Sequence, residues 1–281
     1  MIVTRIDGID DPRVEVFRSL RRVEALRKDH RFVCEGARVV RQLLRSPLPV
    51  HAVLADERWL EELRPALEAR PETDLPVWLT TRKEVEGIIG YSLHQGVMAL
   101  ASAPEAPPLL DAAAREPRHL FVALEGVSSA ENVGGLVRSC AGFGATGMIL
   151  DRASHDPFVR RAARVSMGAI FHLPIWRVES LVPVLGELRD RCGTRSVAAH
   201  LYEPVVDLDR ADLSGPLVVV LGSEAVGITD PVLAACDLRV KIPMHENWGC
   251  LNVGTAGAVM LWEVARARRG GAAGPGARQN L

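Results

Sequence analysis

Polar side chains that can bind or orient a ligand follow three apolar runs of the chain. The runs cover residues 119–124, 217–221 and 238–242. The polar residues are Asn132 and Arg138 after the first run, Glu224 after the second, and Cys250 and Asn252 after the third. An asparagine at the start of a helix can cap it with its side-chain oxygen, so we expect Asn132 and Asn252 to be helix caps. In open α/β sheets the loops after the strands bind ligands, and these loops are therefore candidates for one site.

Glycines accompany these polar residues. Gly134 and Gly135 allow another backbone to approach, and Gly222 and Gly227 enclose the loop that holds Glu224. Glycine permits positive φ and close contact with a ligand. Taken singly, each segment is equally compatible with an ordinary capped helix or turn, and only their order and spacing favour a site.

The three segments together resemble a known family. They read ENVGGLVRSCAGFG, LVVVLGSEAVG and IPMHENWGCLNVGTAGAVMLWE, and a linking piece reads RRAARVSMGAIFHLPIW. Over residues 118–268 they are similar to the motifs of the SpoU (TrmH-type) branch of the SPOUT RNA methyltransferases. The N-terminal part resembles the small α/β substrate-binding domain that many members carry. The matching stretches are FVCEGARVVRQLL and HQGVMALA.

The resemblance implies a fold and an activity. It implies an α/β chain in which a parallel-sheet SPOUT domain with a trefoil knot follows a small RNA-binding α/β domain. It implies S-adenosylmethionine as cofactor, transfer of its methyl group to a ribose 2′-hydroxyl of structured RNA, and a homodimer. Ribosomal RNA is the preferred substrate; tRNA, or a relative that binds RNA without catalysis, are the alternatives.

The resemblance also assigns roles to residues. The catalytic set would be Arg138, Asn132, Glu224, Asn252 and Cys250. The donor-binding set would be Leu221, Gly222, Gly227, Ile242, Met244 and Leu251, with backbone groups of Gly222, Ile242 and Leu251 holding the adenine and amino-acid ends. Because a guanidinium stays protonated at ordinary pH, we favour Arg138 as a phosphate clamp and oxyanion stabiliser over Arg138 as a base.

The third motif departs from the family pattern at Cys250, where most members have serine. A thiol is a weaker hydrogen-bond donor than a hydroxyl and prefers burial. Cys250 is interpreted as a small buried thiol in place of that serine, and a nucleophilic role is the alternative. In the same loop His245 and Trp248 are candidates either for stacking on an RNA base or for loop packing.

The amino-acid composition is typical of a globular protein. The 281 residues are 48% hydrophobic, the mean hydropathy is +0.09 and the net charge is −1. No apolar run is long enough for a membrane span, and the first residues lack a signal-peptide pattern. The five cysteines are scattered without metal-ligand spacing, so we expect no metal, no membrane association and a reducing cytoplasmic setting.

Two segments are basic despite the neutral total. Residues 1–48 contain eleven basic and seven acidic residues, and residues 152–177 contain five arginines and one aspartate. RNA phosphates attract such clusters, although charge runs are often only solvated helix faces. The RNA-binding candidates in the second cluster are Arg152, Arg160, Arg161 and Arg164.

The pattern of elements predicts two domains. We expect a substrate-binding domain over 1–103 with a charged helix over 11–30, a proline-rich linker over 104–117, a methyltransferase domain over 118–268 and a disordered tail over 269–281. From 119 onward strands and helices alternate, which favours a parallel sheet covered by helices. Helix 251–268 is either a dimer interface or a core helix. A nucleotide-dependent oxidoreductase is disfavoured, because no G-x-G-x-x-G follows the first strand of either domain.

Overall fold

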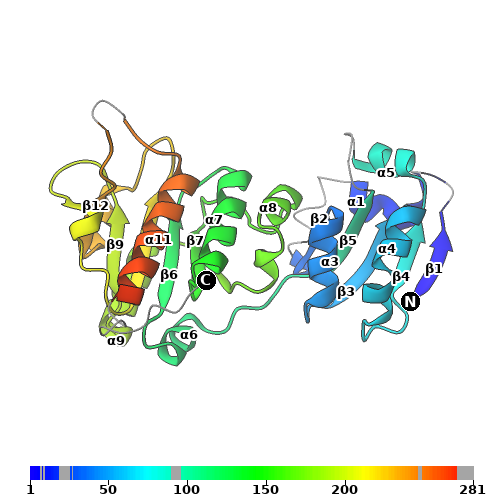
Figure 1. Cartoon of the computed structure of the whole chain (residues 1–281), viewed down its shortest axis with the longest axis horizontal. Helices are drawn as coiled ribbons and strands as arrows, with labels where there is room; N and C mark the ends of the chain where they lie inside the picture. The colour runs from blue at the N-terminus through cyan, green and yellow to red at the C-terminus, as the bar shows by residue number, and fades with distance from the viewer. Residues whose placement is uncertain are drawn as a thin grey trace, which may run out of the picture. The chain divides into compact units, whose positions relative to one another are not determined.

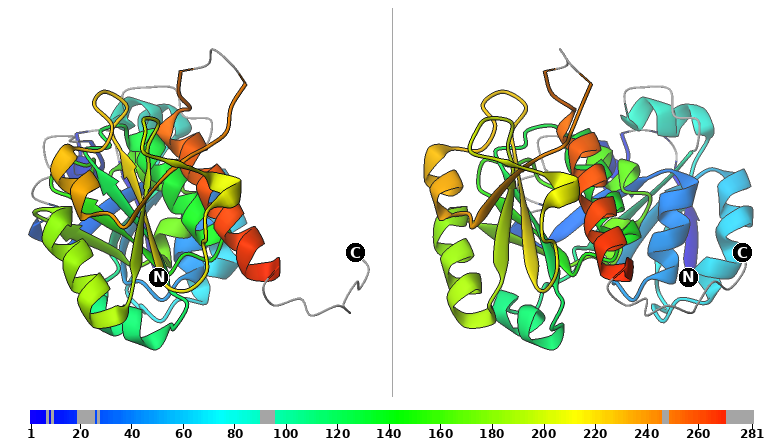
Figure 2. Two further views of the ribbon diagram at one scale, coloured as in Figure 1. Left: turned by 90° about the vertical axis from the view of Figure 1, so that its left-hand side faces the viewer. Right: turned by 60° about the vertical axis from the view of Figure 1, so that its left-hand side comes forward.

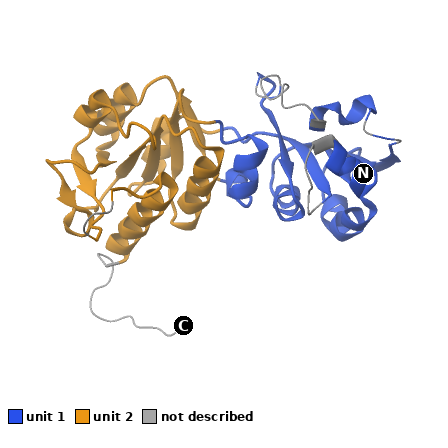
Figure 3. Ribbon diagram, turned by 90° about the horizontal axis from the view of Figure 1, so that it is seen from above, with its two compact units in different colours: residues 1–105, 156–172 blue, residues 106–155, 173–281 orange. Residues whose placement is uncertain are grey.

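The computed structural model describes residues 1–6, 8, 10–18, 26, 28–89, 96–245 and 249–270. The chain forms two compact units (Figure 3). Unit 1 contains residues 1–105 and 156–172, and unit 2 contains residues 106–155 and 173–281. The linking segment 156–172 is therefore part of unit 1, although its sequence lies between two motifs of unit 2.

Unit 1 is built on a five-stranded mixed sheet with the strand order β1-β4-β3-β5-β2 (Figure 1). Its strands are β1 (Ile2–Arg5), β2 (Arg31–Glu35), β3 (Val50–Ala55), β4 (Pro76–Leu79) and β5 (Val97–Ser102). Its helices are α1 (Glu15–Arg18), α3 (Ala37–Arg45), α4 (Glu57–Glu68), α5 (Arg82–Ile89) and α8 (Arg160–Val165). The short edge strand β1 pairs in parallel with β4 and has no periodic signal of its own. Of the helix expected over 11–30, residues 12–18 are helical, while 19–25 and 27 lie outside the described residues.

Unit 2 is built on a seven-stranded sheet with the order β10-β12-β9-β11-β6-β7-β8. Every pairing in it is parallel, which confirms the parallel sheet predicted from the alternating pattern. Its strands are β6 (Leu120–Glu125), β7 (Gly147–Asp151), β8 (Ile175–Val178), β9 (Arg195–Ala199), β10 (Val206–Asp207), β11 (Leu217–Gly222) and β12 (Leu238–Lys241). Its helices are α6 (Leu109–Arg115), α7 (Ala130–Gly142), α9 (Leu181–Cys192), α10 (Asp230–Ala235) and α11 (Val253–Gly270).

Helices cover both faces of this sheet (Figure 2). α7 and α11 contact each other on one face, and α6, α9 and α10 form the opposite layer. Alternate residues of a strand point to opposite faces, so Phe121 and Ala123 of β6 and Val218 and Val220 of β11 enter the core beneath α9. The α6 helix lies within the segment expected to be a linker, because its alanines Ala112 and Ala113 are buried in that core.

The contact of α11 with α7 and β11 depends on Gly257. A Cβ atom at this position would lie 2.3 Å from Cδ2 of Leu136 and 2.8 Å from Cδ1 of Leu221. Both leucines are fully buried, so neither side chain has free space into which it can move. The small residues of the third motif are thus what allows α11 to approach the sheet.

We therefore predict that Gly257→Ala lowers the free energy of unfolding by about 1–3 kcal/mol through overpacking. Gly186→Ala is the matched control: Gly186 lies inside α9 and a Cβ there meets nothing within 4 Å, so alanine should raise stability by about 0.5–1 kcal/mol. Urea unfolding of both variants gives the comparison. Equal stabilisation by the two alanines would contradict the close contact at Gly257.

Candidate active site

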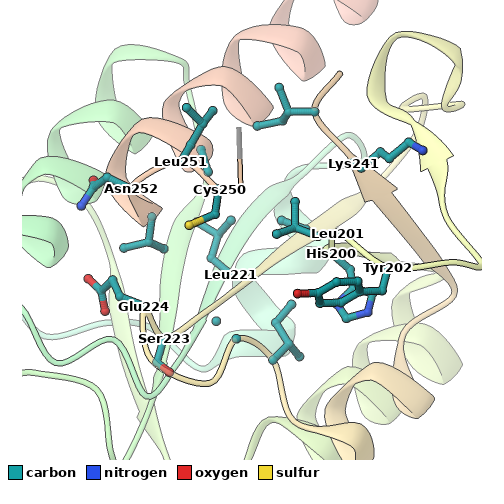
Figure 4. A pocket seen from close by; sticks show the side chains of 18 of the residues that line it. His200, Leu201, Tyr202, Leu221, Ser223, Glu224, Lys241, Cys250, Leu251 and Asn252 are labelled. Atoms are coloured by element: carbon teal, nitrogen blue, oxygen red, sulfur yellow. The ribbon is translucent and has the colours of Figure 1, made fainter. Parts of the chain in front are cut away.

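A cavity of about 670 Å³ lies at the carboxyl ends of β9, β11 and β12 in unit 2 (Figure 4). Its volume is within the range of sites for small ligands. The six residues expected to bind a donor all line it, namely Leu221, Gly222, Gly227, Ile242, Met244 and Leu251. Glu224, Cys250 and Asn252 line it as well. The parallel sheet thus brings the second and third motifs to one place.

A chain of hydrogen bonds connects the three motifs at the rim of this cavity. The side-chain amide of Asn132 donates to the Glu224 carboxylate. Nδ2 of Asn252 donates to Oδ1 of Asn132 over 3.1 Å. Oδ1 of Asn252 in turn accepts the backbone N–H of Gly254 at 2.9 Å and of Thr255 at 3.3 Å. Asn132 contacts the cavity wall through these bonds, although it does not itself line the cavity.

The two asparagines differ in their relation to the helices. Asn252 precedes α11 and accepts two of its first N–H groups, which confirms it as a cap. The expectation that Asn132 caps α7 is wrong, because the helix begins one residue after Ser129, whose hydroxyl accepts the N–H of Asn132. Since the serine caps the helix, the Asn132 side chain is left available for Glu224 and Asn252.

The loop of the second motif is folded tightly on itself. Ser223 and Gly227 exchange backbone hydrogen bonds of 3.1 and 3.0 Å, and Gly227 has φ +72°. A Cβ at Gly222 would lie 2.2 Å from the backbone carbon of Gly227, so only glycine fits there. Glu125, the last residue of β6, accepts both the N–H and the hydroxyl of Thr229 at 2.8 and 2.7 Å, which fixes the end of this loop.

The loop before α7 is held from below by Asp151. Its buried carboxylate accepts the N–H groups of Gly126 at 3.1 Å and Ser154 at 2.8 Å. The Ser154 hydroxyl accepts the N–H of Val127 at 3.1 Å. These bonds join the loops after β6 and β7 and set where α7, and with it Asn132, begins.

Sequence reasoning missed the aromatic side of the cavity, which His200, Leu201 and Tyr202 form at the end of β9 (Figure 4). The His200 and Tyr202 rings lie 5.7 Å apart at an interplanar angle of 74°. Burial, followed by the charge of Arg239, lowers the pKa of His200, so the imidazole is neutral at neutral pH. No signal in the sequence identifies these residues, because only the sheet order shows that β9 lies between β11 and β12.

Arg138 lies apart from the cavity. It is exposed on α7, does not line the cavity, and makes no hydrogen bond or ion pair with any of the residues that the structure describes. Because its guanidinium is unpaired there, it is available to a ligand outside the cavity.

The four arginines expected to bind RNA are placed differently from one another. Arg152 pairs with Glu179 at 3.2 Å, both exposed. In unit 1, Arg164 and Arg160 approach the Glu35 carboxylate at 3.0 and 3.9 Å, and Glu35 is only 1% exposed. Arg161 is exposed on α8. Arg160 and Arg164 therefore help to hold the linking segment onto β2.

The remaining expectations concern a metal site, a membrane span, the His245 and Trp248 side chains and the tail. Among the described residues, no group of histidine, cysteine and acidic side chains is arranged to hold a metal ion, and no helix has the length and apolar character of a membrane span. His245 is exposed, and Trp248 and residues 271–281 lie outside the described residues. The first two residues of the expected tail, 269–270, belong to α11.

Comparisons with known proteins agree with this arrangement. The family model of the SpoU rRNA methylase family matches residues 119–262, and a model for the substrate-binding region of RNA 2′-O ribose methyltransferases matches residues 33–107. An uncharacterized tRNA/rRNA methyltransferase of Mycobacterium avium is 34% identical over 84% of this chain and 77% of its own length. One from Mycobacterium tuberculosis is 31% identical over 95% of this chain and 92% of its own length.

A solved structure has the same fold. The AdoMet-bound rRNA methyltransferase from Sinorhizobium meliloti superposes with a TM-score of 0.79 at 24% identity, over 94% of this chain and 98% of that one. The family match covers most of unit 2, including its three motifs, and the substrate-binding match covers most of unit 1. The chain therefore belongs to the SpoU rRNA methylase family and is an RNA methyltransferase.

Proposed function

We propose that the protein transfers a methyl group from S-adenosylmethionine to a ribose 2′-hydroxyl of ribosomal RNA. The observation that carries the proposal is the hydrogen-bonded set Glu224, Asn132 and Asn252 at the rim of the 670 Å³ cavity. The family description favours ribosomal RNA, and the description of the front region favours ribose as the acceptor. The relatives' printed names include tRNA, which is the alternative substrate.

The cavity fits the proposed donor chemically. Leu221, Ile242 and the half-exposed Leu251 offer apolar walls for a nucleoside, and the Glu224 carboxylate supplies a negative charge at the polar end. The AdoMet-bound neighbour supports the same ligand. The donor supplies a methyl group activated by its sulfonium centre, so the protein's task is to bind, orient and polarise.

The residues of the rim orient the acceptor. Asn132 and Asn252 fix each other, and Glu224 fixes Asn132, so the polar atoms that face the RNA are held before it binds. Arg138 lies six residues, about 1.7 turns, after Asn132 on α7 and has no partner among the described residues. We propose that Arg138 binds an RNA phosphate and stabilises the negative charge that develops on the 2′-oxygen. Cys250 is an exposed thiol in the cavity lining, so the interpretation of it as a small buried thiol is wrong, and we assign it to the cavity wall.

The remaining expectations extend the same proposal. We propose that the trefoil knot and the homodimer of the family are present, and that the protein acts on rRNA maturation in the cytoplasm. All five cysteines are free thiols, which supports a reducing compartment. On α11, Trp262 is 50% exposed, its ring lies 6.1 Å from that of Phe143, and the Arg269 guanidinium lies 4.9 Å above it. This aromatic surface supports a dimer contact through α7 and α11.

Arg138→Ala tests the catalytic assignment. The rate of methyl transfer at saturating donor should fall by roughly 10²–10³-fold, as for loss of an oxyanion-stabilising group. Donor affinity should stay unchanged, because Arg138 does not line the cavity. The measurement is transfer of radiolabelled methyl groups to rRNA and tRNA from cells that lack this protein, followed by nucleoside analysis for 2′-O-methylation.

Arg191→Ala is the matched control for that experiment, since Arg191 is an exposed arginine of α9 that, among the described residues, pairs with Glu187 one turn earlier at 3.3 Å. It should transfer at the wild-type rate. Equal rates of methyl transfer for the Arg138 and Arg191 variants would show that Arg138 takes no part in the reaction. Label on a base rather than on ribose would overturn the 2′-O assignment.

Gly222→Ala tests the donor site. The new methyl group collides with the backbone of Gly227, so the loop must move, and S-adenosylmethionine should bind at least about tenfold more weakly. Calorimetric titration measures this. Gly186→Ala and Cys250→Ser should bind like the wild type. A normal affinity for Gly222→Ala would place the donor elsewhere, and weaker donor binding by Cys250→Ser would show that the thiol contributes to donor binding.

Trp262→Glu tests the dimer. A charge in a buried aromatic contact is strongly unfavourable, so the variant should sediment with half the mass of the wild type. Ile2→Glu, a change at a comparably exposed apolar residue of β1, should leave the mass unaltered. A wild type that sediments as a monomer would refute the proposed dimer outright.

A further inference from the structure

A second cavity lies at the other end of the unit 2 sheet, where the strands begin. Its volume is about 410 Å³, and it is lined by Glu116, Arg118, Gly144, Thr146 and Arg268. Glu116 and Arg118 precede β6, and Gly144 and Thr146 precede β7, so this cavity is at the amino ends of these strands, whereas the donor cavity is at the carboxyl ends of β9, β11 and β12 of the same parallel sheet. No step of the methyl transfer described above uses these residues.

Arg268 is only partly satisfied in this position. Its Nη2 donates to the carbonyl oxygens of His119 at 3.1 Å and Gly215 at 2.8 Å. Its Nε is buried and has no hydrogen-bond partner among the described residues. Burial, followed by the charge of Arg118, lowers the pKa of Arg268. The two guanidinium groups therefore repel each other across the cavity.

Arg118 adds an unpaired charge. Its side chain is exposed and makes no ion pair with any residue in the described part of the chain. Glu116 is the acid of the cavity lining, and its Oε1 accepts the backbone N–H of Arg118 at 3.3 Å. Two arginines and one glutamate leave a net charge of about +1 on the lining at neutral pH.

Thr146 completes a set of donors. Its Oγ1 accepts the N–H of Leu120 at 3.0 Å, which leaves the hydroxyl hydrogen available to donate. A Cβ at Gly144 would meet nothing within 4 Å, so there is open space beside these groups. Guanidinium groups and a hydroxyl around such a space match the oxygens of a phosphate group.

We propose that Arg118, Arg268 and Thr146 bind a backbone phosphate of the RNA substrate, at the end of the sheet opposite the donor cavity. The inference rests on the proposed function. The single net positive charge matches a phosphodiester, which carries one negative charge, better than a doubly charged phosphate monoester. Because α11 starts at the donor cavity and carries Arg268 near its end, the two sites are roughly 25 Å apart at 1.5 Å per residue. An extended RNA spans such a distance. The contact positions the RNA without reading its sequence.

Two neighbouring substitutions should act in opposite directions. Arg118→Ala removes one phosphate contact, so the affinity for a fluorescein-labelled RNA hairpin should fall about tenfold at 50 mM salt, and the slope of log K against log salt should flatten by about one. Glu116→Gln keeps the acceptor for the Arg118 N–H and removes the negative charge, so it should tighten binding. Fluorescence anisotropy of the full chain measures both. Arg268 itself is left intact because its carbonyl contacts support the fold.

Arg191→Ala is the control, and it should bind the hairpin like the wild type. A misfolded variant cannot reproduce the pair of opposite shifts. Wild-type affinity and slope for Arg118→Ala would overturn the phosphate site while leaving the methyltransferase proposal, which donor binding and methyl transfer test separately. A wild-type chain that binds no RNA would overturn both.

Discussion

The hydrogen-bond chain from Glu224 through Asn132 to Asn252 is the constraint on which the site depends. A side-chain amide both donates and accepts, so Asn132 can serve Glu224 and Asn252 at the same time, whereas a carboxylate or an amine could not. The chain ends on N–H groups of α11, the positive end of that helix, and begins at a carboxylate. Its polarity therefore runs in one direction, and each bond strengthens the next. The side chains of Glu224, Asn132 and Asn252 thus fix the positions of three loops that are distant in the sequence.

This chain requires α7 and α11 to approach closely, and small residues provide the room. Gly257 admits Leu136 and Leu221 beneath the helix. Near the start of α11, a Cβ at Gly254 would lie 3.1 Å from Oδ1 of Asn252 and 3.6 Å from Oδ1 of Asn132, so glycine also keeps space around the amides. The loop of Glu224 depends on Gly222 in the same way. Packing and hydrogen bonding therefore depend on the same glycines. A methyl group at Gly222, Gly254 or Gly257 would disturb both.

Much of this arrangement could be predicted from the sequence, because parallel strands place their carboxyl ends at one edge. That rule brought Leu221, Ile242 and Leu251 to one cavity. It could not find His200 and Tyr202, since nothing local reveals that β9 lies between β11 and β12. Asn132 was misjudged as a cap because α7 begins earlier than expected, at Ala130, where Ser129 caps it by accepting the N–H of Asn132. The α6 helix escaped notice because it is short and its burial against α9 is a tertiary effect.

The arginines show most clearly why the number of charged residues in a segment does not predict the charge that its surface offers to a ligand. The segment 152–177 is basic, yet Arg160 and Arg164 approach the buried Glu35 of unit 1. A buried carboxylate needs such partners, so part of that charge stabilises the fold. Arg118 and Arg268 belong to neither basic segment, and they are 150 positions apart in the sequence, but the sheet brings them to one cavity where Glu116 balances only one of them. A chain with a net charge of −1 can therefore present positive sites to RNA, because pairing in three dimensions, and not the count along the chain, determines which cations remain available.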